Sequence, residues 1–349
     1  MGEAAAADPP APAVETPRGR VAPPMPWRTR LAVIAAGYVT DATRRADGSV
    51  NRRLLGVLDK GVPACAAPRN GVASMDLTID PAHSVRARLF YPSSAGGAAP
   101  PVVVFFHGGG FAYLSASSPA YDAACRRIAR YASAAVLSVD YRRAPEHKFP
   151  AAYDDGLAAL RFLDDPANHH PVQLDAARCY LAGDSAGGNI AHHVARRCSL
   201  DPTAFRRVRL AGLIAIQPFF GGEERTPSEL RLAGAPIVNV PRTDWMWRAF
   251  LPAGSDRSHE ACSPDAAAAG LGEAPEFPPA TVVVGGYDPL QDWQRRYCDA
   301  MRREGKEVRV LEYPEAIHAF YVFPEFPDAK DLMLRIKEIV AGGGGGGGQ

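Results

Sequence analysis

Residues 183–187 read Gly183-Asp184-Ser185-Ala186-Gly187, and this short stretch decides the fold. It follows an apolar run, Cys179 to Ala182, and precedes a run compatible with a helix, Gly188 to Ser199. A serine between small residues on a tight strand-to-helix turn has its hydroxyl lifted into a site, where the helix N-terminus favours developing negative charge. The string alone is weak evidence, because small residues also cluster in ordinary turns. Ser185 is therefore a candidate nucleophile, and the surrounding elements and the available partner residues decide between this role and an ordinary turn.

Apolar runs like the one before Ser185 recur along the chain and predict a mostly parallel sheet flanked by helices. Val102 to Phe106 is a continuous apolar run, as a strand buried on both faces requires. The intervals between runs are long enough for crossover helices, which predicts an α/β fold. Ser74 to Asp80 and Val85 to Tyr91 predict an antiparallel start to the sheet. The other predicted elements are strands Ala135 to Val139, Leu213 to Ile216, Thr281 to Val284 and Val308 to Leu311, and helices Tyr121 to Tyr131, Ala152 to Leu163, Pro289 to Glu304 and Asp328 to Val340.

The chain divides into two tails and one folded unit. Residues 1–26 are rich in Ala and Pro and residues 342–349 are nearly all Gly, so both are expected to be disordered around a domain at 27–341. Two helices precede any strand, Trp27 to Tyr38 and Val50 to Leu58. The interval 219–279 is too long for a simple loop and predicts an insertion over one end of the sheet, with a helix at Thr243 to Phe250. The apolar residues at helical spacing in the first helix are Leu31, Ile34, Ala35 and Tyr38.

A serine nucleophile needs a base and an acid that orients the base, and both are available after later strands. Asp288 follows the strand at Thr281 to Val284, and His318 lies just beyond the strand at Val308 to Leu311. The carboxyl ends of parallel strands are where catalytic loops stand, and the order Ser, Asp, His is that of α/β-hydrolases. The sequence therefore predicts Ser185 as nucleophile, His318 as general base and Asp288 as the orienting acid.

A third element of this chemistry follows the strand that ends at Phe106. His107 is followed by Gly108, Gly109 and Gly110. Without side chains, backbone N–H groups can approach a tetrahedral oxyanion closely, and such a loop together with the residue after the serine forms an oxyanion hole. We predict Gly109, Gly110 and Ala186 as its donors, whereas Asp184 is expected to make structural hydrogen bonds beneath the turn.

Four residues are candidates for contact with the substrate. They are Phe111, Trp245, Met246 and Tyr287. The aromatic residues around Met246, which include Trp247 and Phe250, either line a pocket or pack the insertion, and the sequence leaves both alternatives open. For the remaining histidines, His192 and His193 among them, a role in packing or at the surface is favoured over catalysis.

Composition excludes several classes of function. The 349 residues hold 39 Lys and Arg against 38 Asp and Glu, without a basic block, so a nucleic-acid partner is not expected. The six cysteines form no C-x-x-C pair, so neither a zinc site nor a disulfide framework is indicated. No secretory signal and no membrane-spanning run is found, which predicts a protein of the cytoplasm, with the nucleus as a further compartment. Oligomeric state stays open.

These motifs together resemble the plant carboxylesterases of the hormone-sensitive-lipase group, which includes the gibberellin receptors. The similarity rests on residues 46–52 (Ala-Asp-Gly-Ser-Val-Asn-Arg), on His107 to Phe111, on residues 141–147 (Tyr-Arg-Arg-Ala-Pro-Glu-His), on Gly183 to Asn189, and on the segments of Asp288 and His318. It implies the α/β-hydrolase fold, a helical lid at 27–60 over the site, a short-to-medium carboxylic ester as substrate, no cofactor or metal, and an acyl-enzyme mechanism.

The same resemblance leaves two classes of protein, an esterase and a hormone-binding protein like the gibberellin receptors. It implies that the receptors replace the base histidine by an aliphatic residue, whereas this chain keeps His318. It also implies an Arg-Asp-Trp-Tyr-Trp stretch in the receptors, where this chain has Thr243 and Met246 in place of the arginine and tyrosine. An arginine would supply a charge-assisted hydrogen bond to a hormone's carboxylate. The sequence therefore favours the esterase.

Overall fold

A mostly parallel sheet of eight strands organises the computed structural model, which describes residues 25–45, 47–93, 98–168 and 172–342. The strand order is β1-β2-β4-β3-β5-β6-β7-β8. β1 and β2 pair antiparallel with each other, β2 pairs antiparallel with β4, and every other neighbouring pair is parallel. The strands are β1 (Val72–Asp80), β2 (Val85–Pro92), β3 (Pro101–Phe106), β4 (Ala135–Asp140), β5 (Asp175–Asp184), β6 (Leu210–Ile216), β7 (Ala280–Tyr287) and β8 (Val308–Ile317).

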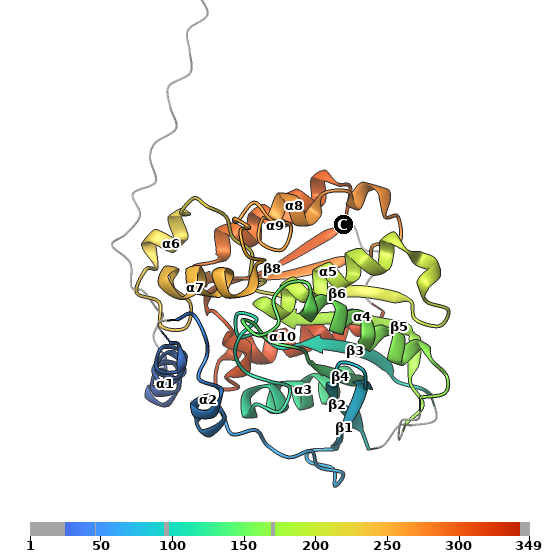
Figure 1. Ribbon diagram of the computed structural model, residues 1–349. Coiled ribbons are helices and arrows are strands. Elements are labelled where there is room, and N and C mark those ends of the chain that lie inside the picture. The colour runs from blue at the N-terminus through green and yellow to red at the C-terminus, as the bar shows by residue number, and fades with distance from the viewer. Residues whose placement is uncertain (1–24, 46, 94–97, 169–171, 343–349) are drawn as a thin grey trace, which may run out of the picture.

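Helices cover both faces of this sheet (Figure 1). Because β3 is apolar throughout, Val103 contacts one core and Val104 the other. Ile128 and Leu332 pack in the first core, and Leu160 and Ile190 in the second. The helices are α1 (Trp27–Thr43), α2 (Arg52–Leu58), α3 (Pro119–Ala132), α4 (Ala151–Asp164), α5 (Ala186–Leu200), α6 (Pro227–Arg231), α7 (Val240–Phe250), α8 (Pro264–Ala268), α9 (Gln291–Arg303) and α10 (Pro327–Val340).

Each predicted strand and helix is present, with ends that differ by a few residues. The largest difference is in β8, which continues beyond the predicted end at Leu311 as far as Ile317. The interval 219–279 contains the predicted helix as α7, together with two short helices that were not predicted, α6 and α8. The predicted tails fall almost wholly outside the described residues.

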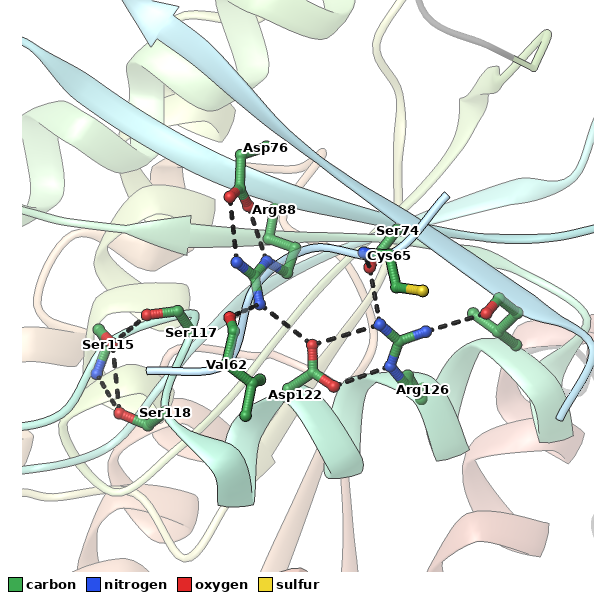
Figure 2. Close-up of polar contacts among 11 residues, drawn as sticks. Val62, Cys65, Ser74, Asp76, Arg88, Ser115, Ser117, Ser118, Asp122 and Arg126 are labelled. Atoms are coloured by element: carbon green, nitrogen blue, oxygen red, sulfur yellow. Dashed lines mark hydrogen bonds and ion pairs between the residues drawn. The ribbon is translucent and has the colours of Figure 1, made fainter. Parts of the chain in front are cut away.

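An ion network ties the antiparallel start of the sheet to α3 (Figure 2). Arg88 on β2 binds Asp76 on β1 and Asp122 on α3, at 2.7 and 3.1 Å. Asp122 also binds Arg126 at 2.7 Å, and Arg126 reaches the hydroxyl of Ser74. Each buried charge in the network thus has a partner, which is the condition for burying it. The network holds the first turn of α3, where Tyr121 beside Asp122 contacts Gly108.

α1 and α2, which we call the lid, lie at one edge of the domain, close to α7 (Figure 1). The apolar residues at helical spacing in α1 do not face the core, since Leu31, Ile34 and Tyr38 are 57, 45 and 74% exposed and Ala35 is exposed as well. The buried residues of α1 are Thr29, Val33, Gly37 and Thr43 instead. Small side chains face inward because Gly37 packs directly against the guanidinium of Arg242 on α7.

Ion pairs at its rim hold the lid in place. Arg242 binds Asp41 on α1 at 2.7 Å and also donates to the carbonyl of Ile237. Arg52 on α2 binds Glu146 and donates to the carbonyl oxygens of Ala112 and Ala144. The lid is therefore tied both to the 219–279 interval and to the loops that follow β3 and β4.

Candidate active site

Ser185 lies between β5 and α5 in a backbone conformation that few residues adopt. Its φ is 53° and its ψ is −120°. The turn is possible because Gly183 and Gly187 pack against each other, and a Cβ on Gly187 would collide with the carbonyl oxygen of Phe106. A non-glycine residue held in such a region typically costs about 1–3 kcal/mol, which the surrounding sheet must offset. The predicted strand–serine–helix turn is thus present.

The glycine loop after β3 lies next to this turn and is held from below. Gly108 N donates to Asp184 Oδ1 at 3.0 Å and to the Tyr121 hydroxyl at 2.8 Å, and Tyr121 donates to Asp184 Oδ2 at 2.9 Å. Asp184 therefore makes the structural hydrogen bonds predicted for it. Within the described residues, no acceptor takes the backbone N–H of Gly109, Gly110 or Ala186. These three N–H groups are left for a ligand.

His318 and Asp288 come together at the same edge of the sheet. His318 directly follows β8, Asp288 directly follows β7, and His318 Nδ1 lies 2.8 Å from Asp288 Oδ2. Both side chains are buried, at 5 and 0% exposure. Asp288 Oδ2 also accepts from Gln217 Nε2 at 3.0 Å and from Gln294 Nε2 at 2.8 Å. The orientation of the carboxylate is thereby fixed.

Gln217 is a residue of this site that sequence reasoning missed. It directly follows β6, is fully buried and has a φ of 45°. Besides Asp288, its Nε2 donates to the carbonyl of Ile317 at 3.1 Å, and its Oε1 accepts from the N–H of Ala319 at 2.8 Å. Gln217 therefore holds the backbone on both sides of His318. The available signal was a lone polar residue placed right after an apolar strand, as Asp288 and His318 are.

The buried carboxylates set the charge state of the histidine. Burial alone would lower the pKa of His318, but the charge of Asp288, the hydrogen bond to it and the charge of Asp184 outweigh burial and raise the pKa above its ordinary value. Burial raises the pKa of Asp184 to about 6, against the opposing effect of the hydrogen bond from Tyr121. The site is thus built to stabilise a positive charge on His318.

Ser185 and His318 open into one cavity of about 340 Å³, which lies under the lid. Gly109, Gly110 and Asp184 line its floor. The lid contributes the residues Ala35, Ala36, Gly37, Val39, Thr40, Leu55, Leu58 and Asp59, and the rest of the wall comes from Tyr113, Leu114, Tyr121, Ile237, Val238, Met246 and Ala319. A nucleophile, a histidine and free N–H donors thus share one largely apolar space.

Of the four residues predicted to contact the substrate, two line a cavity and two are packed behind the cavity wall. Met246 lines the cavity, and Tyr287 lines a small cavity beside it that His318 also borders. Phe111 is fully buried and stacks on Phe250 with ring centroids 3.7 Å apart, outside the cavity wall. Trp245 lies behind Tyr113, with ring centroids 5.8 Å apart. The aromatic residues of this interval mainly pack its interior, because they stack on one another.

His192 and His193 have packing roles, in line with the prediction of a packing or surface role for them. His192 is buried and contacts the hydroxyl of Tyr297 and the carbonyl of Ala267, and burial lowers its pKa to about 4. His193 is buried and stacks on Tyr153. Within the described ranges, no three His, Cys, Asp or Glu side chains come together as a metal site requires, and no helix is long and apolar enough to cross a membrane.

Residues 103–322 match the family model described as the alpha/beta hydrolase fold. One gibberellin receptor of Arabidopsis thaliana is 44% identical over 86% of this chain and 90% of its own length. The gibberellin receptor of Oryza sativa subsp. japonica is 39% identical over 85% of this chain and 89% of its own. Carboxylesterase 20 of Arabidopsis thaliana is 36% identical over 84% of this chain and 93% of its own.

Solved structures of microbial esterases share the architecture. An esterase of Pyrobaculum calidifontis superimposes with a TM-score of 0.69 at 26% identity, over 91% of this chain and 94% of its own. A mutant α/β-hydrolase enzyme from the Lake Arreo metagenome gives a TM-score of 0.71 at 29% identity, over 90 and 98% of the two chains. The likeness thus extends over nearly the whole chain.

Proposed function

This chain belongs to the plant hormone-sensitive-lipase family of α/β-hydrolases, and on that premise we propose that it is a serine carboxylesterase acting on short-to-medium carboxylic esters. The observation that carries the proposal is the buried contact of His318 with Asp288 beside a cavity that also contains Ser185. A protein that only binds a ligand has no need for a base held in one tautomer by a buried acid.

In the proposed first half-reaction, Ser185 attacks the carbonyl carbon of the ester. His318 Nε2 takes the serine proton, and Asp288 stabilises the imidazolium that forms. The negative charge on the tetrahedral oxygen is bound by the N–H groups of Gly109, Gly110 and Ala186. His318 then gives its proton to the leaving alcohol, so that an acyl group remains on Ser185.

In the second half-reaction, water takes the place of the alcohol. His318 removes a proton from water, the hydroxide attacks the acyl carbonyl, and the same three N–H groups bind the second oxyanion. Release of the acid returns the proton to Ser185. The apolar wall under the lid supports a role in excluding bulk water and holding the uncharged parts of the ester.

A second candidate function is the binding of a hormone, as in the gibberellin receptors. The observation in its favour is that the identity to those receptors reaches 44%, against 36% for Carboxylesterase 20. Fold and family do not separate the two functions, because both use the same cavity. The chemistry available at Ser185, Asp288 and His318 favours the esterase.

The test is hydrolysis of a short-chain nitrophenyl ester by the full chain, beside Ser185→Ala and His318→Ala. We expect turnover in the intact protein and a loss of roughly 10³-fold or more in each variant. The exposed Ser255 and His83 provide matched controls as Ser255→Ala and His83→Ala, which should keep full activity. No turnover by a folded protein, with calorimetric binding of a gibberellin, would favour the second candidate.

A further inference from the structure

The cavity above Ser185 contains acidic side chains but no permanently cationic one. Apart from the phenols of Tyr113 and Tyr121, the titratable side chains on its wall are Asp59, Asp184 and His318, and no Arg or Lys of the described chain lines it. The other wall residues are mostly Ala, Val, Leu, Ile and Met. In such a space a charge is weakly screened, so the sign of a ligand's charge has a large effect on binding.

Asp59 is the acid farthest from the proposed chemistry, since it directly follows α2 in the lid. Its Oδ2 accepts from the hydroxyl of Ser118 at 2.5 Å, while its Oδ1 takes no hydrogen bond from any residue in the described ranges. Ser118 precedes α3, whose position is fixed by the ion network of Asp122 in Figure 2. The carboxylate is therefore held in place with one oxygen left for a ligand.

Three arginines on or beside the lid are bound outside the cavity. Arg52 binds Glu146 and two backbone carbonyls, and Arg242 binds Asp41 and two backbone carbonyls. Arg44 lies beside Asp41 and over the ring of Trp245. None of these guanidinium groups lines the cavity or pairs with Asp59, although the charges of Arg44 and Arg52 act on the phenol of Tyr113 from behind the wall.

The wall also offers an aromatic ring to a cation. Tyr113 lines the cavity, and burial raises its pKa to about 12, so its ring stays that of a neutral phenol. The face of a tyrosine ring attracts ammonium groups, including quaternary ones. Asp59 and Tyr113 both line the cavity, the first with a carboxylate and the second with an aromatic ring.

We propose that the cavity selects its ester by charge: the arm of the substrate that reaches Asp59 is cationic, and esters with a carboxylate in that arm are rejected. The proposal rests on the esterase function and specifies its substrate class. A cation would gain attraction from Asp59 and from the ring of Tyr113, whereas a carboxylate would meet like charge without a cation to pair with.

The test uses three acetate esters that match in size and differ in charge. They are acetylcholine, its neutral isostere 3,3-dimethylbutyl acetate, and 4-acetoxy-2,2-dimethylbutanoate. We expect kcat/KM to fall in that order, by about tenfold at each step, since a half-buried ion pair is worth more than an exposed one. Asp59→Asn, which keeps an acceptor for Ser118, should remove most of the difference, and Asp256→Asn at an exposed position should leave it unchanged.

Binding to Ser185→Ala, measured by calorimetry, separates this proposal from the esterase function. The same order of Kd values supports charge selection even if the intact protein hydrolyses none of the three esters, a result that would refute only the proposed catalysis. Equal Kd values for the cationic and neutral esters, or a preference that Asp59→Asn leaves intact, would overturn charge selection.

Discussion

The floor of the cavity and the lid above it are held in different ways. By the floor we mean the glycine loop and Ser185, Asp288 and His318, which follow β5, β7 and β8 at one edge of the sheet. Gln217 and Asp184 hold these residues or their loops through buried hydrogen bonds. The lid contacts the rest of the protein through ion pairs at its rim and exposes large apolar side chains. Buried hydrogen bonds therefore fix the positions of the side chains at the floor, where the proposed reaction requires exact distances. The lid instead gives the cavity its shape and part of its charge.

The change expected to have the largest effect is at the floor. Asp288→Asn should lower kcat by about 10⁴-fold, because an amide can hold His318 in the wrong tautomer while leaving the packing intact. Steady-state kinetics should show this loss with little change in KM, and Asp256→Asn is the matched surface control. A loss below tenfold would mean that Asp288 is not the orienting acid.

The glycine loop provides a second test of the floor. Gly110 has a φ of 58°, and a Cβ there would collide with Met246, so Gly110→Ala should displace an oxyanion donor and lower kcat by about 10²-fold. Gly254→Ala is a matched control, since Gly254 has a φ of 82° with open space around it. Equal activities of the two variants would show that the loop does not bind the oxyanion.

A smaller effect is expected at Gln217. Gln217→Met keeps the volume but removes the hydrogen bonds to Asp288, Ile317 and Ala319, and kcat should fall by about tenfold, as for a loss of ~1–1.5 kcal/mol of positioning. Gln173→Met, at an exposed position, is the control. The outcome that contradicts this role is a rise in KM at constant kcat.

A change in the lid should affect KM, whereas the changes at the floor should affect kcat. Arg242→Ala removes the tie to Asp41, and we expect KM to rise by about fivefold at nearly constant kcat, because lid contacts are the same in the ground and transition states. Arg335→Ala on the surface of α10 is the control. A fall in kcat with unchanged KM would show that the lid acts on the reaction in the same way as the floor.

The smallest effect is a shift in pH dependence. Only neutral His318 can act as base, so kcat/KM should fall as the pH drops through its pKa, which lies above 6.5. The charge of Asp184 helps raise that pKa, so Asp184→Asn should move the acid limb to lower pH, by less than about one unit. A pH–rate profile that stays in place, or moves to higher pH, would contradict the coupling.

Elements with a continuous apolar run or a periodic apolar pattern could be predicted from the sequence, and those too short or too polar for either could not. Val102 to Phe106 is such a run because β3 is buried on both faces. β8 is an edge strand with exposed positions. Because polar residues follow Leu311, the predicted strand ended there, six residues before the end of β8. The lengths of α6 and α8, five residues each, are too short for a periodic pattern.

The candidate site divides in the same way. Ser185, Asp288 and His318 could be found because each belongs to a chemical pattern tied to a strand end. Gln217 could not be identified from the sequence, because a glutamine belongs to no catalytic sequence pattern. Its role depends on the register of β6 beside β7. The apolar spacing of α1 identified the helix but not its inward face, because close packing against Arg242 selects Gly37 there.

The ties of the lid have a consequence for how the protein is made. α1 is synthesised long before the residues that hold it, since Asp41 pairs with Arg242, 201 residues later, and Thr29 pairs with Glu325, 296 residues later. Domains assemble from the N-terminus at only a few residues per second during synthesis. α1 therefore makes its last contact only after Glu325 has been synthesised, when the residues of β8 already exist.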